Sequence, residues 1–85
     1  MSIPRLCLIE DDIIMGESLC DRFELEGFEI DWYQTGAAIV NTLSTDQYNL
    51  VISDIHLPDM TGEEIFLDLI NKDQSPPPFI FITGY

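Results

Sequence analysis

Apolar positions along the chain alternate between the short runs typical of strands and the three-to-four-residue spacing typical of helices. Strands are predicted at residues 5–9, 28–33, 48–53 and 79–83. Helices are predicted between them, at residues 13–26, 35–44 and 62–72. Because strands and helices alternate, the pattern predicts a doubly wound α/β fold with a parallel sheet, right-handed crossovers and helices on both faces.

Single residues mark where the predicted helices begin and end. Thr35 is a suitable N-cap and Gly27 a suitable helix stop, while three consecutive prolines exclude a helix within residues 73–78. The first helix places these residues at helical spacing: Ile13, Gly16, Leu19, Cys20 and Phe23. The third helix is expected to turn these residues inward: Ile65, Leu69 and Ile70.

The composition limits the classes of partner. The chain has 85 residues, 46% of them hydrophobic, so one folded domain with a small core is expected. The formal net charge of −13 comes from 16 acidic and 3 basic residues. Direct contact with nucleic acid or with an anionic membrane is therefore disfavoured, since phosphate groups attract Lys and Arg. A cation site or a basic protein partner fits better, although a solvated acidic surface explains most of the charge.

The cysteines and the N-terminus indicate a cytoplasmic protein. Cys7 and Cys20 fall in a predicted strand and helix, match no zinc-binding spacing, and are expected to be buried and reduced. The first residues lack the apolar run of a signal peptide, and no stretch approaches the roughly 20 apolar residues of a membrane span.

Polar residues with possible chemistry follow three of the strands. Glu10, Asp11 and Asp12 follow the first strand, Asp54 follows the third, and Thr83 ends the fourth. Carboxyl ends of parallel strands form the usual functional edge of such sheets. If the first and third strands are neighbours, the carboxylates of Glu10, Asp11 and Asp54 converge there and repel one another unless a cation neutralises them. Mg²⁺ suits such oxygen ligands, and a carboxylate beside it can attack phosphorus.

Each of these residues also has an ordinary structural interpretation. The acidic triplet can cap the following helix, Asp54 can be a turn residue, and Thr83 can be a strand former only. The His56 side chain has no partner in the sequence, so its backbone carbonyl is the more important group at that position. The coincidence at three strand ends favours a functional site.

Three motifs resemble the receiver domain of two-component response regulators. They are IEDD after the first strand, SDIHLPDMTG around Asp54, and FITG on the fourth strand. The most specific is D-x-x-L-P-x-x-x-G, in which Pro58 and Gly62 would shape the loop. The resemblance implies a flavodoxin-like sheet with strand order 2-1-3-4-5. The stretches around Asp54 and Thr83 look most like receivers attached to sigma-54-dependent transcription activators.

The resemblance also implies a role for each site residue. Asp54 would be the phosphoacceptor that takes a phosphoryl group from a sensor histidine kinase, and Thr83 would be the switch hydroxyl. Mg²⁺ would be bound by Asp11, Asp54 and the backbone carbonyl of His56, with Glu10 acting through a metal-bound water.

Compared with the family, residues 1–85 are expected to be the N-terminal portion of a single receiver domain. The fourth helix, fifth strand and fifth helix of the family are not in the chain, nor are the lysine that ends the fifth strand and the switch aromatic beside it. Lys72 ends the third helix and cannot replace that lysine, and Tyr85 is not taken as the switch aromatic. We therefore expect slow phosphorylation. We also expect self-association through the exposed fourth strand, or low stability, since an apolar edge strand pairs readily.

Three functions are compatible with these features. The favoured one is a phosphoacceptor module that catalyses phosphoryl transfer to its own Asp and is not a turnover enzyme. Its output domain, a DNA-binding domain or an AAA+ activator, would regulate transcription. The alternative is a truncated or pseudo-receiver that acts only in protein interaction. The third is a phosphatase of the haloacid dehalogenase type, which is disfavoured because His56 stands where that family has its second Asp.

Overall fold

Strands and helices alternate along the chain in the computed structural model, which describes residues 3–42, 48–72 and 77–82. The elements are β1 (Arg5–Ile9), α1 (Ile13–Leu25), β2 (Glu29–Tyr33), α2 (Gly36–Thr42), β3 (Leu50–Asp54), α3 (Gly62–Lys72) and β4 (Phe79–Ile82). All predicted elements are present, with described boundaries within two residues of those expected. Among the described helices, none combines the length and apolar character that a membrane crossing requires.

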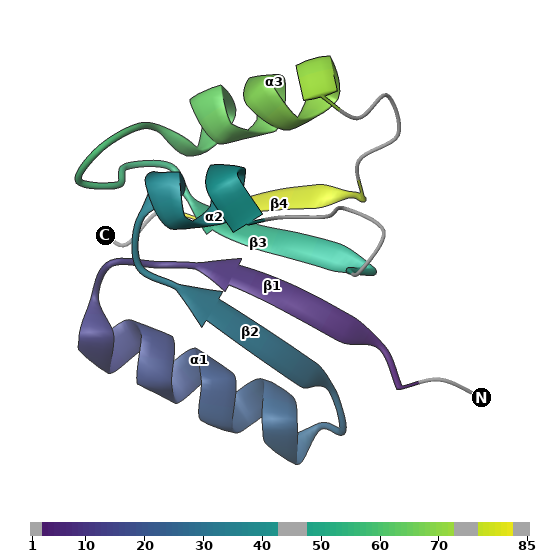
Figure 1. Cartoon of the computed structure of the whole chain (residues 1–85). Coiled ribbons are helices and arrows are strands. Elements are labelled where there is room, and N and C mark those ends of the chain that lie inside the picture. Colours follow the sequence, from purple (N-terminus) through teal and green to yellow (C-terminus); the bar gives the residue numbers. More distant parts are fainter. Residues whose placement is uncertain (1–2, 43–47, 73–76, 83–85) are drawn as a thin grey trace.

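The four strands form one parallel sheet in the order β2-β1-β3-β4. Helix α1 covers one face, and α2 and α3 lie on the other (Figure 1). This is the predicted doubly wound, flavodoxin-like arrangement for the part of the sheet that the chain contains, with β2 at an edge as expected. The turns that follow β1 and β3 lie at the same edge of the sheet (Figure 1).

Side chains of β1 point alternately to the two faces and divide the apolar residues into two cores. Leu6 and Leu8 belong to the core under α1, whereas Cys7 and Ile9 belong to the core under α2 and α3. The first core also contains Ile52, and Leu19, Cys20 and Phe23 of α1 pack against this core. The second core also contains Ile39, Tyr48, Val51, Ile65 and Leu69. Because β1 and β3 are covered on both faces, their sequences are nearly continuously apolar.

Ile70 and Cys20 are less buried than predicted, and Ile13, at the same helical spacing as the first core's residues, is exposed as well. Ile13 is 56% exposed because it is the first residue of α1 and adjoins the exposed acidic turn. Ile70 is 37% exposed, since Leu69 takes the core position and the next residue points about 100° further round the helix. Cys20 is only partly buried, whereas Cys7 is fully buried; both thiols are free, as predicted.

Helix boundaries follow the expected capping chemistry. The Asp12 side chain accepts a hydrogen bond from the Met15 N–H (3.0 Å) and caps α1. Gly27 ends that helix with a φ of 94°, in the left-handed region that favours glycine. The Thr35 hydroxyl accepts a hydrogen bond from the Ala38 N–H (3.2 Å) at the start of α2. The predicted helix stop and N-cap are therefore both confirmed.

Candidate functional site

Three carboxylates meet at the carboxyl edge of the sheet. β1 and β3 are adjacent, with Ile9 opposite Ser53, so Glu10 and Asp54 occupy neighbouring positions one residue further on. One carboxylate oxygen from each of Glu10, Asp11 and Asp54 lies within 4.8 Å of the others. Glu10 and Asp54 are only 1% and 6% exposed, whereas Asp11 is exposed. The predicted convergence of the three side chains is thus observed.

Glu10 is fixed by the neighbouring edge strand. Its backbone carbonyl accepts a hydrogen bond from Trp32 Nε1 (2.8 Å), and its N–H donates to the Tyr33 carbonyl (2.9 Å). Its Oε2 accepts from the Asp12 N–H (3.2 Å), but its buried Oε1 has no hydrogen-bond partner among the described residues. Burial raises the pKa of Glu10 from 4.5 to about 7; the Asp12 N–H opposes this shift and the Asp54 carboxylate adds to it.

The donor set of this cluster fits a hard divalent cation. Glu10 has a buried carboxylate oxygen without a hydrogen-bond partner among the described residues, and burial and the neighbouring carboxylates raise its pKa; a bound cation would favour its charged form. The cluster offers carboxylate oxygens only, which Mg²⁺ prefers, and none of the thiolates or imidazoles typical of zinc sites. Mg²⁺ bound here would have Glu10, Asp11 and Asp54 as its nearest acidic groups.

Asp54 is held by the residues on either side of it. The Ser53 hydroxyl donates to the Asp54 carbonyl (2.9 Å), and the His56 N–H donates to Asp54 Oδ1 (3.2 Å). At Gly62, a Cβ would lie 2.7 Å from the Asp54 carbonyl oxygen and 2.9 Å from Ser53 Oγ. Only glycine therefore lets α3 begin directly against the end of β3.

The remaining predicted site residues lie in different places. The His56 side chain is exposed, and His56 pairs with Thr61 in an isolated antiparallel bridge across the loop that follows β3. Asp12 caps α1 and is not part of the carboxylate cluster. Thr83 lies outside the described residues.

Two contacts that lie outside the predicted site residues also shape this edge of the sheet. Adding a Cβ to Gly16 would place it 2.0 Å from the Trp32 ring, so a glycine within α1 makes room for the indole that binds Glu10. A glycine inside a helical pattern was the available signal for that close approach. Asp59 accepts hydrogen bonds from backbone amides 23 and 22 residues away, at Gly36 and Ala37, and no local pattern indicated this contact.

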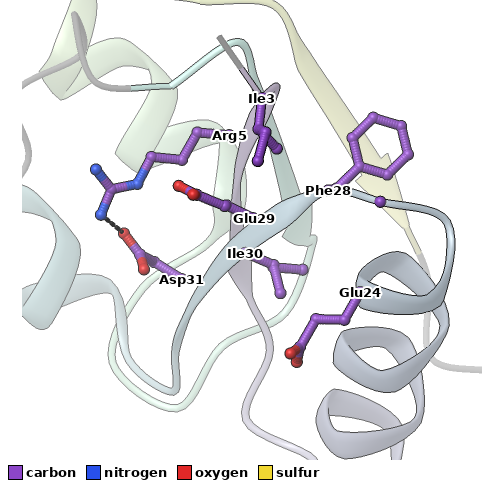
Figure 2. A pocket seen from close by; sticks show the side chains of 8 residues that line it. Ile3, Arg5, Glu24, Phe28, Glu29, Ile30 and Asp31 are labelled. Carbon is purple, nitrogen blue, oxygen red and sulfur yellow. Dashed lines mark hydrogen bonds and ion pairs between the residues drawn. The ribbon is translucent and has the colours of Figure 1, made fainter.

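An open hollow of about 470 Å³ lies at the opposite end of the sheet, where β1 and β2 begin (Figure 2). Two of its charged lining residues pair with each other, Arg5 with Asp31 (3.0 Å), and the Tyr48 hydroxyl donates to the same Asp31 carboxylate (2.7 Å). It shares no residue with the carboxylate cluster. The chemistry of the chain therefore concentrates at the carboxyl edge.

The family model of the response regulator receiver domain matches residues 6–85. Similar curated proteins include the response regulator protein PmrA of Pseudomonas aeruginosa, 37% identical over 73 residues, which are 86% of this chain and 33% of PmrA. The transcriptional regulatory protein QseB of Escherichia coli O157:H7 is 34% identical over 76 residues, 89% of this chain and 35% of QseB. The chain spans about a third of the length of these relatives.

Solved structures agree with this match. The non-phosphorylated HemR receiver domain of Leptospira biflexa is 32% identical, with a TM-score of 0.87, and the alignment covers 95% of this chain and 64% of that one. The response regulator protein TrrA of Thermotoga maritima, solved in complex with Mg²⁺-BeF, is 28% identical with a TM-score of 0.86. That alignment covers 98% of this chain and 71% of TrrA.

Proposed function

The chain belongs to the response regulator receiver domain family, and we propose that Asp54 is the residue that accepts a phosphoryl group in it. The observation that carries this proposal is the convergence of the Glu10, Asp11 and Asp54 carboxylates within 4.8 Å at the ends of adjacent strands. An Asp54 oxygen would attack the phosphorus of a phosphohistidine. The new O–P bond forms as the P–N bond breaks, and the departing imidazole nitrogen takes a proton from water.

Some residues around Asp54 would bind Mg²⁺, and others would orient the Asp54 carboxylate. Asp11, Asp54 and the backbone carbonyl of His56 would bind Mg²⁺, and the unpartnered Oε1 of Glu10 would accept a hydrogen bond from a metal-bound water. Mg²⁺ supplies positive charge that offsets the carboxylates and the phosphoryl oxygens. The His56 N–H engages Asp54 Oδ1, which leaves Oδ2 as the attacking atom.

Thr83 is proposed as the switch hydroxyl. It follows Ile82, whose Cα is the register partner of Asp54 across β3 and β4. Each chain would accept one phosphoryl group on its own Asp54, so the reaction modifies the protein and is not enzymatic turnover. Residues 1–85 would accordingly be the N-terminal portion of a single receiver domain.

A sensor histidine kinase is the proposed phosphoryl donor, and an output domain is the proposed recipient of the signal. The relatives extend well beyond the matched part, since the chain covers 33% of PmrA and 35% of QseB, and QseB is named a transcriptional regulatory protein. We accordingly propose that the whole protein regulates transcription through a DNA-binding or AAA+ output domain. The cytoplasmic location and the sigma-54-dependent type stay predictions.

Self-association of the 85-residue chain through β4 is a further part of the proposal. Among the described residues, β4 has β3 as its only hydrogen-bonded neighbour, and Ile80 and Phe81 on it are 50% and 37% exposed. An exposed apolar edge strand readily pairs with a second copy. Light scattering after size exclusion should show dimers or larger species that increase with concentration; a stable monomer at every concentration would refute this part.

The proposed function is tested by incubating the chain with Mg²⁺ and acetyl phosphate and measuring its intact mass. The wild type should slowly gain the mass of one phosphoryl group, whereas Asp54→Asn should gain none. Asp21→Asn, at an exposed position on α1, is the matched control and should behave as the wild type. An unchanged wild-type mass would instead favour a protein-interaction module that never carries phosphate.

A further inference from the structure

The loop of residues 55–61 carries part of the proposed phosphoacceptor site. It is tied down at its base: the Ile55 N–H donates to the Ile82 carbonyl (3.1 Å), and the Gly62 N–H donates to the Ile55 carbonyl (2.9 Å). His56 and Thr61 bridge the loop above that base. These bonds fix where the loop leaves β3 and enters α3, but they do not fix its tip against the rest of the domain.

The tip of the loop is held by Asp59. Its Oδ1 accepts a hydrogen bond from the Gly36 N–H (2.9 Å), and its Oδ2 accepts one from the Ala37 N–H (2.8 Å). These amides belong to the first turn of α2, where backbone N–H groups lack partners within the helix. The two amides lower the pKa of the Asp59 carboxyl, so Asp59 carries its negative charge in this contact.

An apolar contact beside Asp59 joins the same two segments. A Cβ on Gly36 would lie 2.3 Å from Met60 Cγ, 2.6 Å from Met60 Sδ and 3.2 Å from Ile65 Cδ1. Met60 also packs against the core under α2 and α3. The start of α2 therefore lies as close to the loop as a glycine permits, and two successive loop residues hold it.

We propose that Asp59 is a positioning residue of the phosphoacceptor site, which keeps residues 55–61 against α2 and so places the His56 backbone for Mg²⁺ and Asp54. The proposal rests on the proposed function, because it assumes that Mg²⁺ binds at Asp54. His56 lies three residues before Asp59 in the same short loop, and its N–H already engages the Asp54 carboxylate. Mg²⁺ demands near-ideal ligand geometry, so a loop whose tip is released should bind it more weakly.

The same contact should couple the start of α2 to Mg²⁺ binding at the site. If Asp59 improves Mg²⁺ binding by holding the loop, linkage requires that bound Mg²⁺ strengthen the contact of Asp59 with Gly36 and Ala37. A cap that only stabilised α2 would lower stability when removed, but it would leave Mg²⁺ affinity unchanged. Mg²⁺ affinity and amide exchange therefore distinguish positioning from capping.

The test compares Mg²⁺ affinity in the wild type, Asp59→Asn and Asp59→Ala, using Trp32 fluorescence, with urea unfolding as a check that each variant is folded. Asp59→Ala should weaken affinity by about tenfold, the lower range for lost outer contacts of metal sites. Asp59→Asn keeps one acceptor oxygen, so its Mg²⁺ affinity should lie between those of the wild type and Asp59→Ala. The exposed Asp21→Ala is the matched control and should match the wild type.

Equal affinities in the wild type and both Asp59 variants would overturn the positioning role while leaving the proposed function intact. Failure of the wild type itself to bind Mg²⁺ would overturn the proposed function and, with it, this inference. If Asp59→Ala does not fold, hydrogen exchange in the wild type decides. The Gly36 and Ala37 amides should exchange more slowly with Mg²⁺ than without it, and unchanged exchange would overturn the proposal.

Discussion

The indole N–H of Trp32 donates a 2.8 Å hydrogen bond to the backbone carbonyl of Glu10. This bond connects the edge strand β2 to the carboxylate cluster, and it exists because Gly16 leaves room for the indole beneath α1. Trp32 is also the one tryptophan in the chain. The domain therefore contains an intrinsic reporter in direct contact with a proposed metal-site residue.

Mg²⁺ should change the fluorescence of Trp32 in a saturable manner. Binding at the cluster shifts the charge next to the Glu10 carbonyl, to which the indole is bonded. Asp11→Asn removes an exposed member of the cluster and should weaken the apparent affinity by about tenfold or more. A titration of Asp11→Asn that superimposes on that of the wild type would show that the cation binds elsewhere.

Glu10→Gln should stabilise the metal-free protein at neutral and higher pH. Burial raises the pKa of Glu10 to about 7 from 4.5, so the folded state binds this proton more tightly than the unfolded state does. Stability without Mg²⁺ consequently falls as the pH rises from about 4.5 through about 7. Glutamine imitates the neutral acid and avoids that loss.

Urea unfolding in EDTA measures the effect of Glu10→Gln. The variant should exceed the wild type by on the order of 1–3 kcal/mol near pH 8, and the difference should vanish near pH 4. Adding Mg²⁺ should reduce the advantage, since the cation compensates the charge in the wild type. Parallel curves of unfolding free energy against pH for the two proteins would mean that ionising Glu10 does not destabilise the folded state.

Gly16→Ala should destabilise the domain by about 1–3 kcal/mol, the usual range for overfilling a packed site. The added methyl group would meet the Trp32 ring at 2.0 Å and push the indole away from the Glu10 carbonyl. The emission maximum of Trp32 should therefore shift as well. Ser18→Ala, at an exposed position of the same helix, is the control and should change stability by less than about 0.5 kcal/mol.

Cys7 should be protected from alkylation until the domain unfolds. It is fully buried, and burial followed by the negative charge of Asp31 raises the pKa of its thiol to about 12. Because only the thiolate reacts, iodoacetamide should modify the partly exposed Cys20 first. Peptide mapping in increasing urea should show Cys7 modified along the unfolding transition; rapid modification in buffer would contradict the burial of β1.

The strands and the acidic residues at their ends could be predicted from local features of the sequence, whereas the strand order came from the resemblance to the receiver family. The buried strands are nearly continuous apolar runs, and parallel strands bring their carboxyl ends to one edge. Asp54 ends β3, and Glu10 follows β1, which pairs with it. Adjacency of those two strands was the one assumption needed to bring the carboxylates together.

The contacts of Trp32 and Asp59 could not be predicted, because each depends on the direction of one side chain between segments far apart in the sequence. The acidic turn after β1 shows the same limit: Asp12 caps α1, while Glu10 and Asp11 join the cluster. The charge pattern by itself does not separate these adjacent carboxylates; the resemblance gave metal roles to Glu10 and Asp11 only, and the backbone path shows why Asp12 is a cap. Ile13 and Ile70 were placed by helical spacing alone, which does not show where a helix leaves its neighbours.

Asp54 is proposed to accept the phosphoryl group, and the chemistry of an acyl phosphate allows the position of the modified residue to be identified. After incubation with Mg²⁺ and acetyl phosphate, sodium borohydride should reduce a phosphorylated aspartate to homoserine, and tandem mass spectrometry then finds that residue. Homoserine is expected at position 54, with none at Asp11, Asp12 or Asp59, and none anywhere in Asp54→Asn. Homoserine at another position, or its complete absence from the treated wild type, would contradict the account.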